Sequence, residues 1–269
     1  NKKINKCRIN SLSKFSNNCH KVTFIKHWTK SLFSFRIQRP QSFKFRSGEF
    51  VMIGLPNKED KPILRAYSIA SPSWSEELEF YSIIVQDGPL TSKLKNIKID
   101  DEIIMMPKST GTLVLDALKP GKRLFLLSSG TGFAPFASLI REPETYEKFE
   151  TVVVTHTCRT VPELAYSQEI INESNDDEII KDFIENKLIS YHSTTRENFS
   201  NKGRITELIS TNKIFNDLNI ENISSDDRFM FCGSMGLNND LKAIMVKHNM
   251  QEGANNNPAE FVLEKAFVG

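Results

Sequence analysis

The chain has 269 residues, of which 35 are Lys or Arg and 33 are Asp or Glu, and 39% are hydrophobic, a globular composition long enough for two domains. Its longest apolar runs have the length of strands, which argues against a protein embedded in a membrane. The cysteines show neither a CxxC pair nor the spacing of a zinc or iron–sulfur site, so we expect reduced thiols in the cytoplasm and no metal; they are Cys7, Cys19, Cys158 and Cys232.

The net charge of +2 hides a strongly basic N-terminal part, because residues 1–50 contain twelve Lys or Arg and a single acid, Glu49. These charges are dispersed through strand-like sequence without a nucleic-acid-binding motif, so we expect an acidic protein as partner rather than nucleic acid. Residues 1–18 are rich in Lys, Ser and Asn and lack acids, which suits a transit peptide or a disordered arm. We favour a basic N-terminal arm.

Residues 19–118 contain short runs rich in Phe, Val, Ile and Thr, separated by turn residues. Such runs predict a closed or nearly closed antiparallel β-barrel of the Greek-key kind. A short helix is expected in PLTSKLKNI, at 89–97. The expected strands lie within residues 19–28, 31–40, 48–56, 63–72, 78–88 and 101–109.

After Lys119-Pro120-Gly121 the pattern changes to apolar strands alternating with helix-periodic segments. This alternation predicts a doubly wound α/β domain with a parallel sheet over residues 119–269. No low-complexity linker separates the halves, so we expect them to pack directly together. The expected strands are 124–129, 151–159, 187–195 and 229–234, and the expected helices are 133–142, 162–171, 204–212 and 237–248.

Ligands of an open parallel sheet bind beyond the carboxyl ends of its strands. The first strand of the second half is followed by Gly130-Thr131-Gly132, where glycines let backbone amides approach a phosphate. Arginines follow the next two strands, and Glu150 stands at the wrong end of its strand to bind ribose hydroxyls. This pattern favours NADP over NAD. The arginines are Arg159, Arg196 and Arg204.

Each of these signals also has an ordinary explanation. A lone GTG is weak, arginines at strand ends are mostly solvated surface, and Cys232 is more often a small buried filler than a reactive thiol. Their coincidence on one sheet edge is what favours the nucleotide site.

Seven motifs in order resemble the bacterial ferredoxin–NADP⁺ reductases, also called flavodoxin reductases, from about Cys19 to Gly269. The resemblance implies an N-terminal barrel that binds FAD, a C-terminal domain that binds NADP(H), and cofactors that meet in the cleft between them. The motifs are RAYSIASP, DGPLTSKL, GTGFAPF, HTCR, TTRE followed by GR, FCGS and EKAFVG.

For the flavin, the resemblance implies that Arg65 pairs with the pyrophosphate, that Tyr67 stacks on the isoalloxazine ring, and that Ser68 hydrogen-bonds near N5. From the residues alone, an ordinary cross-strand pair of Arg and Tyr accounts equally well for RAYS. In DGPLTSKL, helix capping and phosphate binding use the same backbone amides, so the sequence does not separate them. The further FAD residues that the resemblance implies are Ala66, Thr91, Ser92, Ala266 next to the ring, and Phe267 on the adenine.

For the nicotinamide pocket, the resemblance implies Ser68, Cys232, Glu264 and Ala266 as catalytic residues. A solvent-facing glutamate near a chain end, and a hydrophobic tail that fills a groove, are the alternatives. The NADP-binding residues implied are Thr131, Gly132, Arg159, Thr194, Arg196, Arg204, Cys232 and Gly233.

The expected activity is hydride exchange between NADP(H) and FAD, coupled to one-electron exchange with ferredoxin or flavodoxin docked on the basic barrel face of a monomer. One alternative is the flavin reductase component of an oxygenase. Others are a non-catalytic electron-transfer subunit that binds FAD, or a binding module with no cofactor. The three arginines argue against the non-catalytic subunit, and the missing iron–sulfur cysteines require a separate electron carrier.

Overall fold

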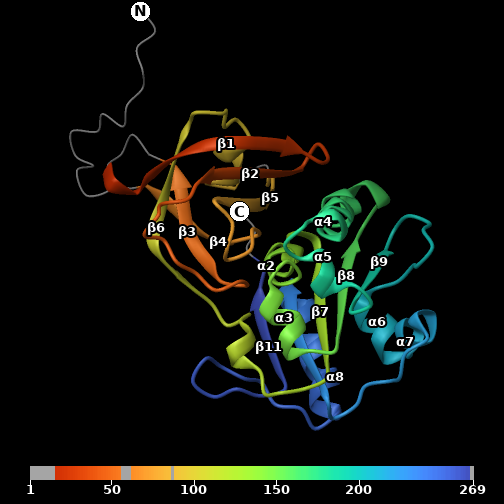
Figure 1. The fold of residues 1–269 in the computed structure, drawn as a ribbon. Helices are drawn as coiled ribbons and strands as arrows, with labels where there is room; N and C mark the ends of the chain where they lie inside the picture. Colours follow the sequence, from red (N-terminus) through yellow and green to blue (C-terminus); the bar gives the residue numbers. More distant parts are fainter. Residues whose placement is uncertain (1–15, 56–61, 86–87, 267–269) are drawn as a thin grey trace, which may run out of the picture.

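The computed structural model describes residues 16–55, 62–85 and 88–266. Its N-terminal half forms an antiparallel six-stranded sheet in the order β4-β3-β6-β1-β2-β5 (Figure 1). The six predicted strands are confirmed, as β1 (Cys19–His27), β2 (Leu32–Gln38), β3 (Phe50–Leu55), β4 (Ile63–Ser68), β5 (Glu77–Ile83) and β6 (Glu102–Thr110).

The sheet curls until its two edge strands approach each other, which confirms a nearly closed barrel. The Ala70 amide, just beyond β4, donates to the Glu79 carbonyl of β5 at 2.8 Å. Between the same strands, the Tyr67 and Ser82 hydroxyls lie 3.0 Å apart. The interior is aromatic, with Phe35 and Phe80 rings 5.4 Å apart. Burying such rings supplies most of the energy that holds a small barrel together.

The short helix α1 (Thr91–Leu94) follows β5, and its Leu94 is buried in the barrel core. This confirms a helix at that place, although it is shorter than expected. Residues 1–15 of the predicted arm lie outside the described residues, and Ser16–Asn18 form the 3₁₀ turn η1 before β1.

The second half is a parallel sheet of five strands in the order β11-β10-β7-β8-β9. Since β7 comes first in sequence, the order reverses between β7 and β10, which is the switch point of a doubly wound fold. The strands are β7 (Arg123–Ser129), β8 (Thr151–Cys158), β9 (Leu188–Thr194), β10 (Asp227–Gly233) and β11 (Phe261–Lys265).

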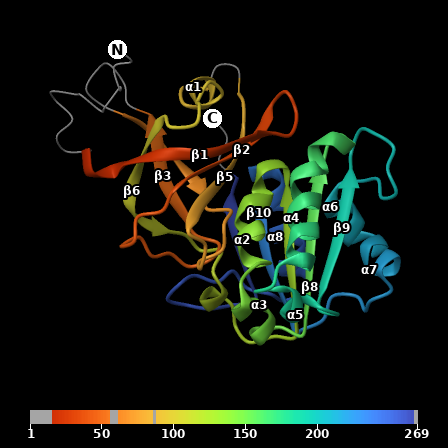
Figure 2. The same ribbon diagram turned by 45° about the horizontal axis from the view of Figure 1, so that its top comes forward.

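Helices cover both faces of this sheet (Figure 2). One face is covered by α2 (Ala134–Leu139), α3 (Pro143–Lys148), α4 (Ala165–Asp176) and α5 (Lys181–Ile184). The other is covered by α6 (Ile205–Ser210), α7 (Lys213–Leu218) and α8 (Met235–Lys247). Short 3₁₀ turns complete the fold: η2 (Leu115–Ala117), η3 (Gly130–Phe133) and η4 (Val161–Leu164). Neighbouring residues of a strand point to opposite faces, so Leu124 and Leu126 pack under the first set and Phe125 under the second.

The structure adds elements that the sequence pattern did not predict, namely β11, α3, α5 and α7. The three helices have four to six residues, too few for a helical period to stand out. Strand β11 pairs in parallel with β10, placing Glu264 opposite Cys232. Only its place in the sheet identifies this five-residue segment as a strand.

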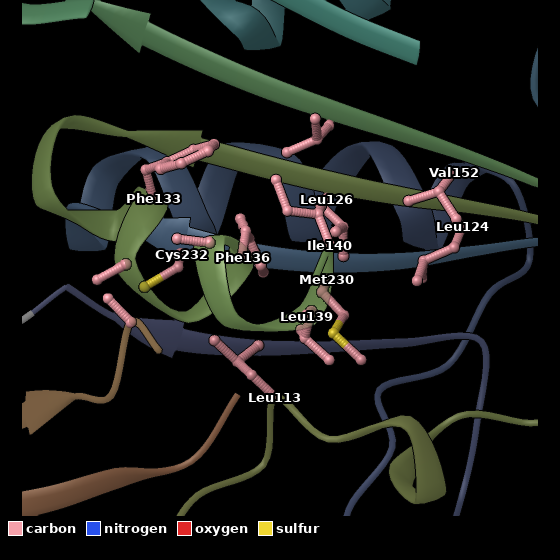
Figure 3. Close-up of a cluster of buried hydrophobic side chains, with 14 of the residues drawn as sticks. Leu113, Leu124, Leu126, Phe133, Phe136, Leu139, Ile140, Val152, Met230 and Cys232 are labelled. Atoms are coloured by element: carbon pink, nitrogen blue, oxygen red, sulfur yellow. The ribbon is translucent and has the colours of Figure 1, made fainter. Parts of the chain in front are cut away.

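The two halves pack directly together, as expected from a chain without a linker. Leu32, Ala70 and Tyr81 from the barrel side belong to the same buried cluster as Phe133 and Phe136. Figure 3 shows part of this cluster. The chain passes between the sheets from Thr110 to Arg123, and the predicted domain boundary at 118/119 falls within this connection. It remains a prediction.

None of the helices in the described ranges is long and apolar enough to cross a membrane. Within those same ranges, no group of three or more His, Cys, Asp or Glu side chains is arranged to hold a metal ion.

Candidate functional site

The turn after β7 lies at the switch point of the parallel sheet and is shaped by two glycines. Gly130 has a φ of +54°, and nothing lies within 4 Å of where a Cβ would stand. Gly132 has no room, because a Cβ would lie 2.1 Å from the Cys232 carbonyl oxygen. Gly130 therefore leaves open space in front of the turn, whereas Gly132 lets the turn pack against β10.

A buried histidine supports this turn from below. His156 Nε2 lies 2.8 Å from the Gly130 carbonyl oxygen, which only accepts, so Nε2 carries the proton. Its Nδ1 lies 2.7 Å from the Ser167 hydroxyl oxygen, which lies 3.0 Å from His192 Nε2 and also donates to the Leu164 carbonyl at 3.0 Å. Burial and the neighbouring His192 lower the pKa of His156 to about 3. This neutral network was not predicted from the sequence, although HTCR at a strand end was a signal for it.

The three predicted arginines come together because the loops after β8 and β9 are tied by backbone hydrogen bonds. The Arg196 amide donates to the Arg159 carbonyl at 3.0 Å. Gly203, just before Arg204, donates to the Thr194 carbonyl at 3.0 Å. All three arginine side chains are exposed, and within the described part of the chain none pairs with a carboxylate.

A cavity of about 450 Å³ opens beside these arginines. Arg159 and Arg204 line it, but Arg196 does not. Of the predicted Thr194 and its neighbour Thr195, only Thr195 lines the cavity. Thr194 is fully buried, and its hydroxyl donates to the Glu197 carbonyl at 2.7 Å. The cavity also includes Gly130 of the predicted glycine turn, and five residues that were not predicted from the sequence: Ser129, Glu163, Ser234, Gly236 and Asp240.

Among these, Ser234 carried a recognisable signal. It follows β10 directly and caps α8, since its Oγ accepts from the Leu237 amide at 3.2 Å. A Ser at the end of a parallel strand and the start of a helix marks a helix N-terminus that faces the ligand side of the sheet.

Cys158 and His156 lie close enough to look like a nucleophilic pair, with Sγ 3.2 Å from Nε2. Burial first, and then the Glu163 charge, raise the pKa of Cys158 to about 12. The nearby imidazole is neutral, so it does not stabilise a thiolate. Cys158 is therefore an inert wall of the cavity.

A second, smaller pocket lies at the seam between barrel and parallel sheet. It brings together predicted residues that lie far apart in sequence: Ser68 from β4, Cys232 from β10 and Ala266 after β11. The Ala266 amide donates to the Gly233 carbonyl at 2.8 Å, which fixes this part of the tail beside β10. The remaining lining residues are Tyr67, Tyr81, Thr131 and Ala134.

Glu264 does not line the seam pocket, although it stands opposite Cys232 in the sheet. Its Oε1 accepts from the Thr112 amide at 2.5 Å and from the Thr112 hydroxyl at 3.2 Å. Its Oε2 is buried without a hydrogen-bond partner in the described structure. Desolvation by burial raises the pKa of Glu264, so this carboxyl takes up a proton more readily than an exposed one.

The predicted flavin-binding residues on the barrel differ in how far they are exposed and in whether their polar groups are already bonded. Arg65 is exposed and donates to the Leu64 carbonyl at 2.9 Å, which leaves most of its guanidinium donors available. Ala66 and Ser92 are partly buried. Thr91 is 1% exposed, and its hydroxyl bonds the amide and carbonyl of Val85, so it closes the preceding loop. Phe267 lies outside the described residues.

The chemistry of these donors fits a phosphorylated dinucleotide beside a second cofactor. Unpaired arginines and an open glycine turn suit phosphate groups, and the cavity is large enough to take part of a nucleotide. The seam pocket, with a volume of about 10 Å³, offers hydroxyls beside the small residues Ala134, Cys232 and Ala266.

Comparison with known proteins supports this assignment of the two halves. Residues 19–114 match the family model described as oxidoreductase FAD-binding domain. A flavodoxin/ferredoxin–NADP reductase of Rhodobacter capsulatus is 56% identical over 249 residues, which cover 92% of this chain and 92% of that protein. A ferredoxin–NADP reductase of Azotobacter vinelandii is 45% identical, covering 93% and 98%.

Among solved structures, a ferredoxin NADP⁺ reductase from Neisseria gonorrhoeae with bound FAD and NADP superposes with a TM-score of 0.83 at 28% identity. The match covers 93% of this chain and 98% of that one.

Proposed function

The chain belongs to the flavodoxin/ferredoxin–NADP reductase family, and on that premise we propose how its residues serve the two cofactors. The reaction is electron exchange between NADP(H) and ferredoxin or flavodoxin through FAD. When bound, FAD exchanges a hydride with the nicotinamide and passes electrons to the carrier one at a time. The protein contributes binding, orientation and exclusion of water.

On the nucleotide side, Arg159 and Arg204 hold the 2′-phosphate of NADP(H). The supporting observation is that both line the large cavity and neither pairs with a carboxylate among the described residues. Arg196 lies outside the cavity and adds to the positive electrostatic potential around the phosphate site. The Thr131 and Gly132 backbone would hold the pyrophosphate, beside the open space in front of Gly130. We further assign Thr195, rather than Thr194, to direct contact with the nucleotide.

On the flavin side, Arg65 beside Ala66 in β4 would hold the FAD pyrophosphate. Ser92 would contribute its hydroxyl, since its amide already donates to the Gly88 carbonyl at 3.1 Å. The Thr91 hydroxyl bonds the amide and carbonyl of Val85 and so fixes the start of α1 next to Ser92. We assign Tyr67, which lines the seam pocket, to stacking on the isoalloxazine ring. Phe267, which the resemblance assigns to the adenine, lies outside the described residues.

At the seam, Ser68 orients the reacting edge of the flavin, and the small side chains of Cys232 and Ala266 let the nicotinamide approach. Gly233 holds Ala266 in place through its carbonyl. Burial raises the pKa of Glu264, so its unpaired Oε2 takes up a proton more readily than an exposed carboxyl does. Positioning of this kind supplies much of the acceleration in a reaction between two bound partners.

The carrier docks on the barrel of a monomer. Much of the basic charge there is neutralised locally, because Lys26, Arg36 and Arg46 each pair with a carboxylate. Lys21, Lys30 and Lys44 are exposed and form no ion pair within the described ranges, so they offer positive charge to an acidic carrier. The buried thiols of Cys158 and Cys232 suit a reducing compartment such as the cytoplasm.

The observation that carries this proposal is the meeting of Ser68, Cys232 and Ala266 in one pocket next to the arginine-lined cavity. The test is an absorbance scan of the purified protein before and after anaerobic addition of NADPH. We expect a flavin spectrum that bleaches with NADPH and recovers when an oxidised carrier is added. A yellow protein whose spectrum NADPH leaves unchanged would instead be the non-catalytic electron-transfer subunit. A protein that reduces an oxygenase component, but neither ferredoxin nor flavodoxin, would instead be the oxygenase reductase.

A further inference from the structure

Tyr81 lies at the seam because side chains alternate along β5. Its neighbour Phe80 points into the barrel core, so Tyr81 points the other way, into the cluster shared with the parallel sheet. It is 3% exposed and lines the seam pocket together with Ser68, Cys232 and Ala266. No motif in the sequence singled it out.

The Tyr81 ring is held firmly. It stacks on Tyr166 of α4 with centroids 4.1 Å apart and planes at 17°. Tyr166 is itself fixed, since its hydroxyl donates to Glu79 Oε1 at 3.0 Å and the edge of Trp28 packs 5.3 Å away. Glu79 is in turn paired with Arg36 at 3.0 Å. The position of the Tyr81 hydroxyl is therefore set before any ligand arrives.

The Tyr81 hydroxyl is unusual among the tyrosines of this chain because it is buried without a hydrogen-bond partner in the described structure. Leaving a buried hydroxyl unpaired is unfavourable, so such groups normally have a partner. The other four hydroxyls are paired: Tyr67 with Ser82, Tyr146 with the Ile140 carbonyl, Tyr166 with Glu79 and Tyr191 with Asp217.

We propose that the Tyr81 hydroxyl donates a hydrogen bond to the carboxamide oxygen of the bound nicotinamide and so sets the orientation of that ring. The carboxamide is the polar group that a nicotinamide ring presents, and four of the lining residues come from the nucleotide half: Thr131, Ala134, Cys232 and Ala266. Burial raises the pKa of Tyr81 well above its ordinary value, so the phenol remains a donor at any working pH. This inference rests on the assignment of the seam pocket to nicotinamide made above.

The test compares Tyr81→Phe with the unaltered protein, both loaded with FAD. Each is titrated with NADP⁺ and with 2′,5′-ADP, which carries the 2′-phosphate but no nicotinamide. We expect the Kd for NADP⁺ to rise about fivefold, close to 1 kcal/mol, with no change for 2′,5′-ADP. The limiting rate of flavin reduction by NADPH should fall by a similar factor, because the ring is less well oriented.

Tyr146→Phe is the matched control, because it removes another buried hydroxyl far from the seam. It should lower Tm, since the Ile140 carbonyl loses its partner, and leave both affinities unchanged. Tyr81→Phe should leave Tm of the protein without nucleotide unchanged, because no protein group in the described structure loses a bond.

Three results overturn the inference. Equal affinities of Tyr81→Phe and the unaltered protein for NADP⁺ show that the hydroxyl does not touch the nicotinamide. Weakened retention of FAD shows that it serves the flavin, and a fall in Tm like that of Tyr146→Phe shows a structural role, for example through a buried water. Failure of the unaltered protein to bind 2′,5′-ADP is a separate result, since it removes the nucleotide site itself.

Discussion

Replacement of Arg204 by Ala tests the assignment of the 2′-phosphate most directly. Arg204 stands at the N-terminal end of α6 and lines the large cavity. Its guanidinium is exposed and pairs with no carboxylate in the described part of the chain. Removing it therefore leaves no buried carboxylate without a partner. We therefore expect folding to be unaffected and the whole effect to appear in coenzyme binding.

The magnitude follows from the charged hydrogen bond that the substitution removes. A hydrogen bond to a charged group contributes about 1.5–3 kcal/mol, and solvent around Arg204 places this one in the lower part of that range. A weakening of about 1.5–2.5 kcal/mol corresponds to a rise of roughly ten- to seventyfold in the KM for NADPH. NADH lacks the phosphate, so its KM should change less than about twofold.

Steady-state reduction of a dye acceptor with each coenzyme measures this ratio. Arg196→Ala is the matched control, because Arg196 lies next to Arg159 in the loop pairing but outside the cavity. Its effect on the KM for NADPH should stay below about threefold, as for a solvent-screened charge. An Arg204 variant that raises both KM values equally, or an Arg196 variant with the larger effect, refutes the assignment.

Three further predictions concern the seam, the histidine network and the docking surface. Ser68→Ala should retain FAD but slow reduction by NADPH in stopped flow, and an unchanged rate would remove Ser68 from the chemistry. Burial lowers the pKa of His156 to about 3, against roughly 6.5 in an unfolded chain. Between these two pH values the unfolded state binds more protons than the folded state, so the free energy of unfolding falls as the pH drops from about 6.5 towards 3. His156→Gln should flatten the slope of Tm against pH between about pH 6.5 and 4; an equally steep slope contradicts this. Reduction of ferredoxin or flavodoxin should slow as salt rises, with a smaller slope for Lys30→Ala, whereas indifference to ionic strength would deny an electrostatic encounter.

Local patterns predicted most of the fold, because strand periodicity and turn residues act over a few positions. The six barrel strands and four of the five parallel strands lie where the apolar runs placed them. What the pattern missed is short or defined by pairing: β11 is a strand because it lies beside β10, and its five residues show no period of their own.

For the candidate site, the order of residues was enough to specify which chemical groups are present: a glycine turn after the first parallel strand, arginines after the next two, and a Ser, a Cys and an Ala in recognisable motifs. The folded arrangement sets which of them face a ligand. The sequence does not distinguish Thr194 from Thr195, because both are threonines at the end of the same strand. Only Thr195 lines the cavity, because neighbouring side chains point to opposite sides where β9 ends.

Tyr81 shows the same division most clearly. Its sequence neighbourhood is that of an ordinary barrel strand, and nothing local marks its hydroxyl as unpaired. That property arises because β5, α4 and the tail after β11 are brought together by the packing of one half against the other. Burial and hydrogen-bond satisfaction are properties of such long-range packing, so only the folded chain determines them.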